Sequence, residues 1–578
     1  MISKNFVKAS AILMSGIFIL AACGQPATEN KDANALPVIS AENIKAHVTF
    51  LADDTLGGRD TGSREYQIAA NYVASQYKQL GLKPAGDNGS YFQTVNFSKS
   101  SIDPDATTVS LTVDGKTKTL KMGVDYHMFA DQTSLENLAS GEIIFVGHGI
   151  SAPEAGHDDF SDIDLTGKII ARLQGAPEGA SDAVKEAAHD KTLHGAAGAI
   201  TLYTPAKNET QPFDSIGKYF IMEKFNWVAP VGSEDKESEG VNAFISPAMG
   251  EALLAGVGLS FDQALEAAAA GDFVAVPLGS TIDMKQVTKK SDPVSSPNVA
   301  GVIIGSDPTL NDQYVIISAH LDHVGTCPHR EHDTAAVEDT ICNGALDNAS
   351  GVATMIEAAR AFVDNGKTPR RSLMFLAVTA EEKGLLGAEY FAHYPTVDKS
   401  KIVANVNLDM PVLLYDFADV VAFGGEHSTM GEIASRATAR IGMSVAEDPM
   451  PEENLFTRSD HYRFVEQGIP SVFLMSGPTA VGETETDVKE RQGYKTFYEF
   501  LKTNYHSPAD DIGQPLNWDA AAKFSLVNYL IMDEIANADV EPRWYEGDSF
   551  GDNFAPNAPR APALIIEAAP ESAVPATE

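Results

Sequence analysis

The sequence predicts an α/β fold in which helices sandwich a mostly parallel, mixed sheet. Three continuous apolar runs of strand length support this prediction, at residues 314–318, 372–379 and 402–406. A segment with helical periodicity, residues 350–363, lies between the first two runs. Buried parallel strands are apolar on both faces and are usually joined by helices. A sheet of this kind is therefore the expected core of the chain.

Groups that can bind a metal ion stand where each apolar run ends. In open α/β sheets, ligands bind outside the carboxyl ends of the strands. We therefore expect these groups to lie together at one edge of the sheet. They are His320 and Asp322 after the first run, Asp347 in the loop that follows, Glu381 and Glu382 after the second run, and Asp409 after the third.

Length and charge limit the class of protein. At 578 residues the chain is too long for one compact core, so two or more domains are expected. Its hydrophobic content of 44% is ordinary for a globular protein. The net charge of −38 argues against a nucleic-acid partner, because nucleic-acid binding depends on basic patches.

The N-terminus predicts export and a lipid anchor. Basic residues precede an apolar run at residues 9–22, which is short for a membrane-spanning helix and typical of a signal peptide over residues 1–22. The run ends in Leu-Ala-Ala-Cys, which resembles a bacterial lipobox, and this resemblance implies that Cys23 carries lipid. Gly24 in place of Asp implies the outer membrane, with the protein facing the periplasm or the surface. Residues 23–38 would be a tether. An ordinary cleaved signal with a chance cysteine is the alternative.

Residues 39–135 are expected to form the N-terminal part of the domain that holds the sheet. A helical pattern from residue 39 is interrupted by a turn-rich loop at 56–63 and resumes at 66–80. Two short strands with a hairpin-type turn should follow. They are residues 107–113 and 117–122, joined by Asp114-Gly115.

Residues 136–282 are expected to form an inserted α/β module, and the polar segment 283–297, with two prolines, its joint to the rest. The histidines of the module lack the spacing of a catalytic set, so we expect them to be surface or packing residues. The elements predicted in the module are strands at 142–146, 168–173 and 195–203 and a helix at 183–194.

Residues 283–545 are expected to carry the sheet and its site. The apolar residues of the helix at 350–363 fall on one face, which suits packing on a sheet, and a late strand at 471–475 should extend that sheet. Residues 546–578 include a Pro-, Ala- and Glu-rich stretch without periodicity and are predicted to be a disordered acidic tail.

The clustered groups favour a divalent cation. Uncompensated charge buried at the end of a sheet is costly, and a cation compensates for it. Imidazole nitrogen and carboxylate oxygen without thiolate suit a catalytic zinc site. Two ions that share one carboxylate need a second histidine, which His506 can supply. Asp322 and Asp510 are expected to orient His320 and His506 through their second ring nitrogens.

The motifs resemble those of the co-catalytic di-zinc aminopeptidase family, which is related to glutamate carboxypeptidase and glutaminyl cyclase. The resemblance implies a zinc-exopeptidase fold of the phosphorylase/hydrolase type. The inserted segment resembles a protease-associated domain, and Arg59-x-x-Gly62 matches relatives with that domain. The family motifs, all in the family's order, are His320-Leu-Asp322, Gly344-Ala-Leu-Asp347-Asn-Ala-Ser-Gly351, Glu381-Glu382, Asn407-Leu-Asp409 and His506-Ser-Pro-Ala-Asp510.

Carried over residue by residue, the resemblance implies a role for each group. Asp347 would bridge two Zn²⁺ ions, with other divalent ions possible, and Glu381 would be the general base that takes a proton from the attacking water. The remaining ligands would be Glu382 and His506 at one ion and His320 and Asp409 at the other. Residues 458–462 resemble a segment that lies near the substrate in this family. The substrate contacts expected from it are Arg458, Asp460, His461 and Tyr462.

Two further cysteines flank a polar insert between His320 and Asp347. If the protein is exported, Cys327 and Cys342 can form a disulfide that pins this insert over the site, although two unpaired thiols are the alternative. The insert also contains His329 and His332, for which the family implies no role. We interpret these as ordinary loop histidines.

The activity implied is the release of N-terminal amino acids from peptides that have a free N-terminus. A dipeptidase or carboxypeptidase on the same metal core is the alternative, and Arg458 is the basic residue that could recognise a carboxylate. A non-catalytic binding or receptor protein on the same fold is a remote alternative. The complete set of ligands together with Glu381 favours an enzyme.

Overall fold

The structure is a computed structural model that describes residues 36–161, 163–188, 192–233, 240–270, 273–327 and 339–564. The expected signal peptide and Cys23 lie outside these residues, as do His189, His329 and His332. Among the described helices, none combines the length and the apolar character that a membrane span requires.

A mixed sheet forms the core of the part that carries the candidate ligands, and it confirms the predicted α/β class. Its central strands run parallel, and antiparallel neighbours flank them. In order across the sheet, the strands are β13 (Val276–Ile303), β15 (Ser372–Val378), β14 (Tyr314–His320), β16 (Ile402–Leu408), β19 (Ser471–Ser476), β17 (Asp419–Phe423) and β18 (Ser444–Ala446).

Helices cover both faces of this sheet because alternate strand residues point to opposite sides. Val315 and Ile317 of β14 enter one apolar cluster, whereas Ile316 enters another. Two groups of helices pack against these two clusters. The first group includes α1 (Ala41–Leu51), α2 (Arg64–Leu80), α8 (Gly351–Asn365), α10 (Met430–Ala439), α12 (Gln492–Thr503) and α13 (Trp518–Asn537), and the second α9 (Leu386–His393) and α11 (His461–Val465).

A second sheet is built from the inserted segment together with three strands that precede it, at residues 108–128. The predicted boundary between residues 135 and 136 therefore does not separate the two sheets. The predicted hairpin is present, and Asp114 and Gly115 have the positive φ values of 49° and 71° that such a turn requires. Across this sheet the order is β4 (Lys116–Thr119), β3 (Thr108–Val113), β13, β6 (Glu136–Phe145), β9 (Ile169–Leu173), β10 (Gly198–Leu202), β12 (Asn242–Ile245) and β5 (Tyr126–Met128). Its helices are α3 (Asp182–Ala187), α4 (Pro205–Thr210), α5 (Phe213–Ile221), α6 (Pro247–Ala255) and α7 (Phe261–Ala268).

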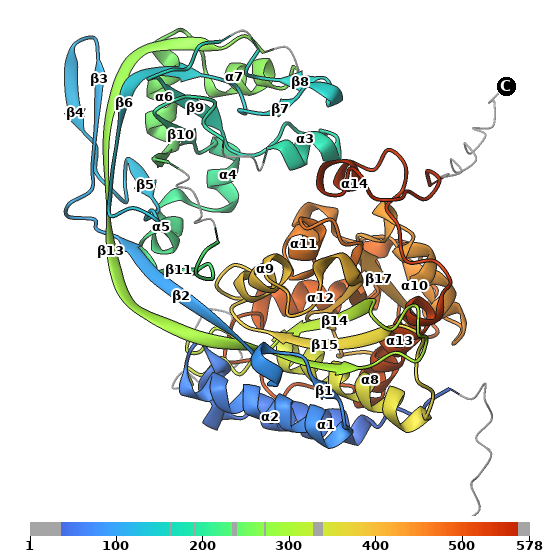
Figure 1. Cartoon of the computed structure of the whole chain (residues 1–578). Helices are drawn as coiled ribbons and strands as arrows, with labels where there is room; N and C mark the ends of the chain where they lie inside the picture. Colours follow the sequence, from blue (N-terminus) through green and yellow to red (C-terminus); the bar gives the residue numbers. More distant parts are fainter. Residues whose placement is uncertain are drawn as a thin grey trace, which may run out of the picture. The chain divides into compact units, whose positions relative to one another are not determined.

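The joint predicted at 283–297 lies where the chain passes from one sheet to the other, but it is part of the continuous strand β13 and not a separate linker. The first half of β13 pairs with β3 and β6, and the second half pairs with β15 and with β2 (Phe92–Ile102). The pairing with β2 skips the residues between Ser291 and Val294, so Pro293 removes no ladder hydrogen bond there. The two sheets therefore share a strand (Figure 1) and are not joined by a polar linker.

The disordered tail predicted from residue 546 is wrong as far as residue 564. Helix α14 (Ser549–Phe554) follows Trp544, and Trp544 and Phe550 are buried against Tyr462 and Val465. The indole of Trp544 donates a hydrogen bond of 3.0 Å to the carbonyl of Gly468. The burial of these two aromatic side chains orders the segment, although the composition of the residues that follow predicts disorder. Residues 565–578 lie outside the described part of the chain.

Candidate metal centre

The register of the parallel strands brings His320 and Asp409 together. His320 is the last residue of β14, and Ser318 pairs with Asn407, so Asp409 follows β16 level with His320. The Nε2 atom of His320 lies 3.1 Å from Oδ1 of Asp409 and 3.1 Å from Oδ1 of Asp347. Three potential ligands therefore face one point at the sheet edge.

The other oxygen of Asp347 faces a second set of groups. Nε2 of His506 lies 3.3 Å from Oδ2 of Asp347 and 3.0 Å from Oε2 of Glu382. His506 stands in the turn after α12, where its ring stacks on Tyr505 at 3.8 Å between centroids. Two ligand atoms of one tetrahedral zinc ion, with bonds of about 2.0–2.2 Å, stand roughly 3.3–3.6 Å apart, close to the separations found here. The donor atoms and their spacing thus fit two ions that share Asp347.

Within each set, the carboxylates favour the positively charged form of the histidine. Burial disfavours a charged His320, yet the carboxylate of Asp409 raises its pKa well above the usual range. Burial likewise opposes a charged His506, but Glu382 and Asp347 raise its pKa to about 10. A cation that binds here must displace protons from both histidines, so metal binding should release protons.

Asp322 and Asp510 hold loop backbones in the structure, not the histidine rings that the sequence analysis paired with them. The Asp322 carboxylate accepts hydrogen bonds from the backbone N–H groups of Glu381 at 3.2 Å and Glu382 at 3.4 Å, whereas Nδ1 of His320 contacts the Asp322 carbonyl oxygen. The Asp510 carboxylate accepts from the N–H groups of Leu346 and Asp347 at 2.9 and 3.0 Å. Each aspartate therefore fixes the loop that presents a candidate ligand.

Two polar side chains fix the remaining candidate ligands. The hydroxyl of Ser459 donates to Oδ2 of Asp409 at 2.6 Å, which leaves Oδ1 to face His320. The side-chain amide of Asn348 donates to the carbonyl of Leu408 at 2.8 Å and so ties the loop after Asp347 to the end of β16. The site thus has a second layer of hydrogen bonds of the kind that orients metal ligands.

Arg59 is a buried positioning residue at the base of the site. Its guanidinium donates to the carbonyl oxygens of Leu51, Leu321, Asn343 and Gly344, at 2.9 Å for Leu321 and 2.6 Å for Asn343. Burial lowers its pKa to about 10, and the nearby carboxylates oppose that change. In the sequence Arg59 is only part of a family match, because a lone arginine in a Gly-rich loop gives no sign that it joins the two ligand-bearing loops.

Glu381 lies in the cleft beside the two sets. A cavity of about 270 Å³ is lined by Asp347, Glu381 and Asp409 together with the side chain of Tyr505. Burial raises the pKa of Glu381 well above the usual range, and the carboxylates of Glu382 and Asp409 raise it further. Neither set of candidate ligands includes Glu381. Its carboxylate is therefore placed to exchange a proton with a molecule in the cleft.

The rest of the cleft is mostly apolar, with one ion pair. Arg458 lines it and pairs with Glu453 at 3.2 Å. Asp460, His461 and Tyr462, expected as substrate contacts, are buried and absent from its lining. The reason is that they begin α11, where His461 and Tyr462 pack on Phe456. The apolar lining residues are Met410, Leu455, Phe473 and Leu501.

Cys327 and Cys342 are joined by a disulfide in the structure. Their Cα atoms are 6.0 Å apart, within the usual range for such a bond. The backbone N–H of Cys342 donates to the carbonyl of Gly325 at 2.9 Å. The bond thus links the segment after His320 to the start of the loop that presents Asp347.

His323 is a buried histidine that the sequence analysis missed. It groups with Asp347, Glu382 and His506 among the residues that could hold one ion. The available signal was its place directly after the His320-Leu-Asp322 motif. Asp322 is the last residue of that motif, and its carboxylate accepts hydrogen bonds from the backbone of Glu381 and Glu382. The residue after it, His323, therefore lies close to Glu382.

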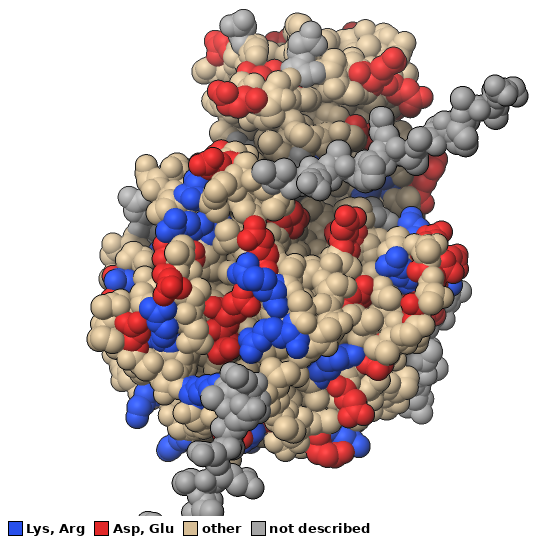
Figure 2. Space-filling view, turned by 90° about the vertical axis from the view of Figure 1, so that its right-hand side faces the viewer, with Lys and Arg blue, Asp and Glu red and all other residues tan. Residues whose placement is uncertain are grey.

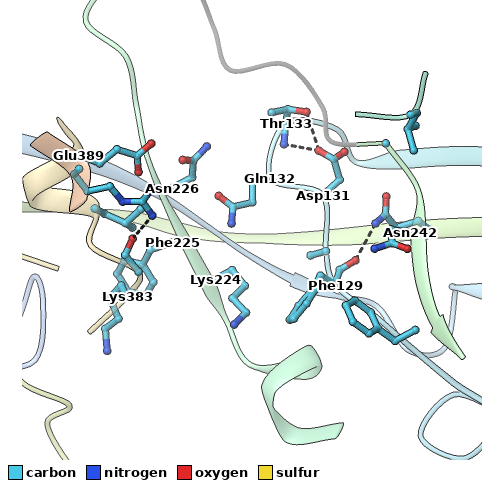
Figure 3. A pocket seen from close by; sticks show the side chains of 18 of the residues that line it. Phe129, Asp131, Gln132, Thr133, Lys224, Phe225, Asn226, Asn242, Lys383 and Glu389 are labelled. Atoms are coloured by element: carbon cyan, nitrogen blue, oxygen red, sulfur yellow. Dashed lines mark hydrogen bonds between the residues drawn. The ribbon is translucent and has the colours of Figure 1, made fainter. Parts of the chain in front are cut away.

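A separate cavity of about 510 Å³ borders the loop after Glu382 (Figure 3). It is lined by Lys383, Glu389 and Arg463, by Lys224 of the inserted segment, and by Asp131, which precedes that segment. Figure 3 shows Asp131 and Glu389 at opposite ends of this cavity. Its acidic groups do not converge, so the candidate site lies in the smaller cleft.

Charge is mixed on the surface visible in Figure 2. Lysine and arginine side chains are interspersed there with aspartate and glutamate, and no continuous basic patch covers this face. This distribution gives no support there to a nucleic-acid partner.

Comparison with known proteins identifies a family resemblance in the second half of the chain. Residues 298–532 match Peptidase family M28. Leupeptin-inactivating enzyme 1 of Streptomyces exfoliatus is 27% identical over 237 residues, which are 39% of this chain and 50% of that protein. A probable zinc metalloprotease of Pyrenophora teres f. teres is 33% identical over 118 residues, 20% of this chain and 23% of that protein. Aminopeptidase YwaD of Bacillus subtilis is 27% identical over 210 residues, 36% of this chain and 40% of that protein.

The match covers half or less of each relative. The chain spans about half the length, or less, of the curated relatives it matches. The matched segment contains every candidate ligand and Glu381, and it resembles the zinc metallopeptidases of family M28, which are hydrolases.

Proposed function

We propose that the chain is a two-zinc aminopeptidase that releases N-terminal residues from peptides. The observation that carries the proposal is the position of Asp347, whose two oxygens face different sets of candidate ligands at 3.1 and 3.3 Å. A carboxylate in this position can hold two ions side by side, as hydrolases with two-metal sites require. The similarity to M28 peptidases supports the same chemistry.

Different residues of the cleft would have different roles in hydrolysis. Bound zinc would polarise the scissile carbonyl and lower the pKa of the attacking water. Glu381 would accept a proton from that water and return it to the departing amine. Asp322 would hold Glu381 in place through the backbone bond described above. The apolar walls of the cleft would exclude bulk water and seat the side chain of the N-terminal residue.

The charges of the cleft favour an amine over a carboxylate. Asp347, Glu381 and Asp409 all line it. Arg458, the basic residue among those that line it, is already paired with Glu453. A substrate carboxylate would compete with Glu453 for Arg458, whereas the rest of the charged lining is acidic and would attract an α-amine. Aminopeptidase activity is therefore favoured over carboxypeptidase activity.

Metal removal combined with a substrate comparison tests this proposal. The purified protein should hydrolyse aminoacyl anilides, lose this activity with a chelator, and regain it when Zn²⁺ is added back. Peptides with a blocked N-terminus should resist hydrolysis. Preferential hydrolysis of N-blocked peptides would favour the carboxypeptidase alternative, and full activity after complete metal removal would exclude a metallopeptidase.

The proposal extends to export and a lipid anchor at Cys23, and to the identity of the inserted segment as a protease-associated domain. The apolar run before Cys23 and its lipobox-like end support the anchor. In a bacterial host, the full chain should fractionate with membranes, and Cys23→Ser should release it to the soluble fraction. Equal membrane association of both forms would contradict a lipid at Cys23.

A further inference from the structure

We propose that His323 is a metal ligand, through Nδ1, at the ion that Asp347, Glu382 and His506 hold. This site would then have four protein groups, while the site of His320 and Asp409 has three, counting Asp347 in both. The inference rests on the proposed two-metal function and deepens it.

His323 contacts Glu382 directly. Nδ1 of His323 lies 2.7 Å from Oε1 of Glu382 and 3.7 Å from Oδ2 of Asp347. Despite the short distance, neither Nδ1 nor Oε1 has a hydrogen-bond partner of acceptable geometry among the described residues. The His323 side chain has no solvent exposure. Two unsatisfied buried polar atoms that converge in this way require a partner, and a cation satisfies both.

The fold holds the His323 ring in this place. The backbone N–H of His323 donates to the carbonyl of Arg59 at 3.3 Å. The ring packs on Gly344, where an added Cβ would lie 2.6 Å from its Cγ atom. Its other neighbour is the ring of His506, 5.4 Å away between centroids and nearly perpendicular. Gly344 therefore provides space that a larger residue would take from the imidazole.

An asymmetry between the two metal sites follows. One site offers two imidazoles and two carboxylates, and the other offers one imidazole and two carboxylates. Since each additional ligand adds binding free energy, the first ion should occupy the site of His323 and the second the site of His320. Stepwise filling with different affinities is the expected consequence.

The test compares the parent protein with His323→Asn, using one equivalent of metal. Asparagine keeps a polar side chain of similar reach but is not a preferred zinc ligand. The dissociation constant of the first Zn²⁺, measured by chelator competition, should rise by at least about 100-fold. With Co²⁺ as a probe, the visible spectrum of the singly loaded protein should change as one nitrogen ligand is lost. His323→Ala should behave alike, which guards against an effect specific to asparagine.

His427→Ala provides a matched control, because His427 is a partly buried histidine paired with Asp548, outside both sets. Its first-ion affinity and Co²⁺ spectrum should equal those of the parent. If His323→Asn binds the first ion like the parent, or if its affinity falls while the Co²⁺ spectrum is unchanged, His323 is not a ligand. Those results leave the proposed function intact. That function fails separately if the parent neither binds Zn²⁺ nor hydrolyses peptides.

Discussion

Replacing Asp347 by alanine should remove both metal ions and abolish peptide hydrolysis. Each oxygen of this carboxylate faces a different histidine, His320 on one side and His506 on the other. Loss of one side chain therefore takes a ligand from both sites at once. We expect the dissociation constant of each ion to rise by at least about 100-fold. Metal analysis after dialysis should fall from two ions per chain to nearly none.

Asp409→Ala is the matched comparison for this prediction. Asp409 faces His320 only, so its removal should release one ion and leave the site of Glu382 and His506 loaded. The contrast between no ions and one ion separates a bridging carboxylate from an ordinary one. If Asp347→Ala kept one ion at the parent affinity, Asp347 would serve a single site and the two-metal proposal would fail.

The strand ends could be predicted from the sequence because their signals are local. A run such as residues 372–379 is apolar throughout, and Glu381 and Glu382 follow it directly. Parallel strands in register bring such ends to one edge of the sheet, regardless of the length and conformation of the loops between them. His320 and Asp409 meet for this reason, although 89 positions separate them.

The contacts around those groups could not be predicted in the same way. The carboxylate of Asp322 was expected to bind His320, yet it accepts from the backbone of Glu381. Which partner an aspartate takes depends on how the loops approach one another, and spacing along the chain does not contain that information. His323 was missed because a histidine next to a known motif has no distinguishing pattern. Its significance lies in a contact with Glu382, a residue from another strand end.

The regular structure at 283–297 and after residue 546 was missed for the same reason. Proline and polar residues at 283–297 indicated a joint, and the Pro- and Ala-rich stretch indicated a tail from residue 546. In both places a few long-range contacts outweigh local composition. β13 is held by pairing along both halves, and residues up to 564 by the burial of Trp544 and Phe550. Tertiary packing commonly overrides local preference in this way.

Glu381→Gln should lower kcat by a factor of about 10²–10⁴ or more while both ions stay bound. Glutamine preserves the size of the side chain and its position on the loop that Asp322 holds. It removes the ability to accept a proton. Because Glu381 belongs to neither candidate ligand set, the metal content and the KM should stay near those of the parent.

Glu382→Gln is the natural counterpart, since the two glutamates are adjacent in the sequence. Oε2 of Glu382 lies 3.0 Å from Nε2 of His506, so this change should weaken metal binding at that site. Adding excess Zn²⁺ should restore part of the activity of Glu382→Gln and none of that of Glu381→Gln. A Glu381→Gln variant with near-parent kcat would show that another group moves the proton.

The pH dependence of kcat provides a second measurement on the parent enzyme and Glu381→Gln, because it depends on the protonation of Glu381. Burial and the neighbouring carboxylates Glu382 and Asp409 raise its pKa, which favours the protonated form that cannot act as a base. Bound cations act in the opposite direction, because positive charge stabilises the carboxylate. Metal binding would therefore both activate the water and ionise the base. In the loaded enzyme, kcat should decline as the pH falls through the pKa of Glu381, and the residual activity of Glu381→Gln should lack that decline.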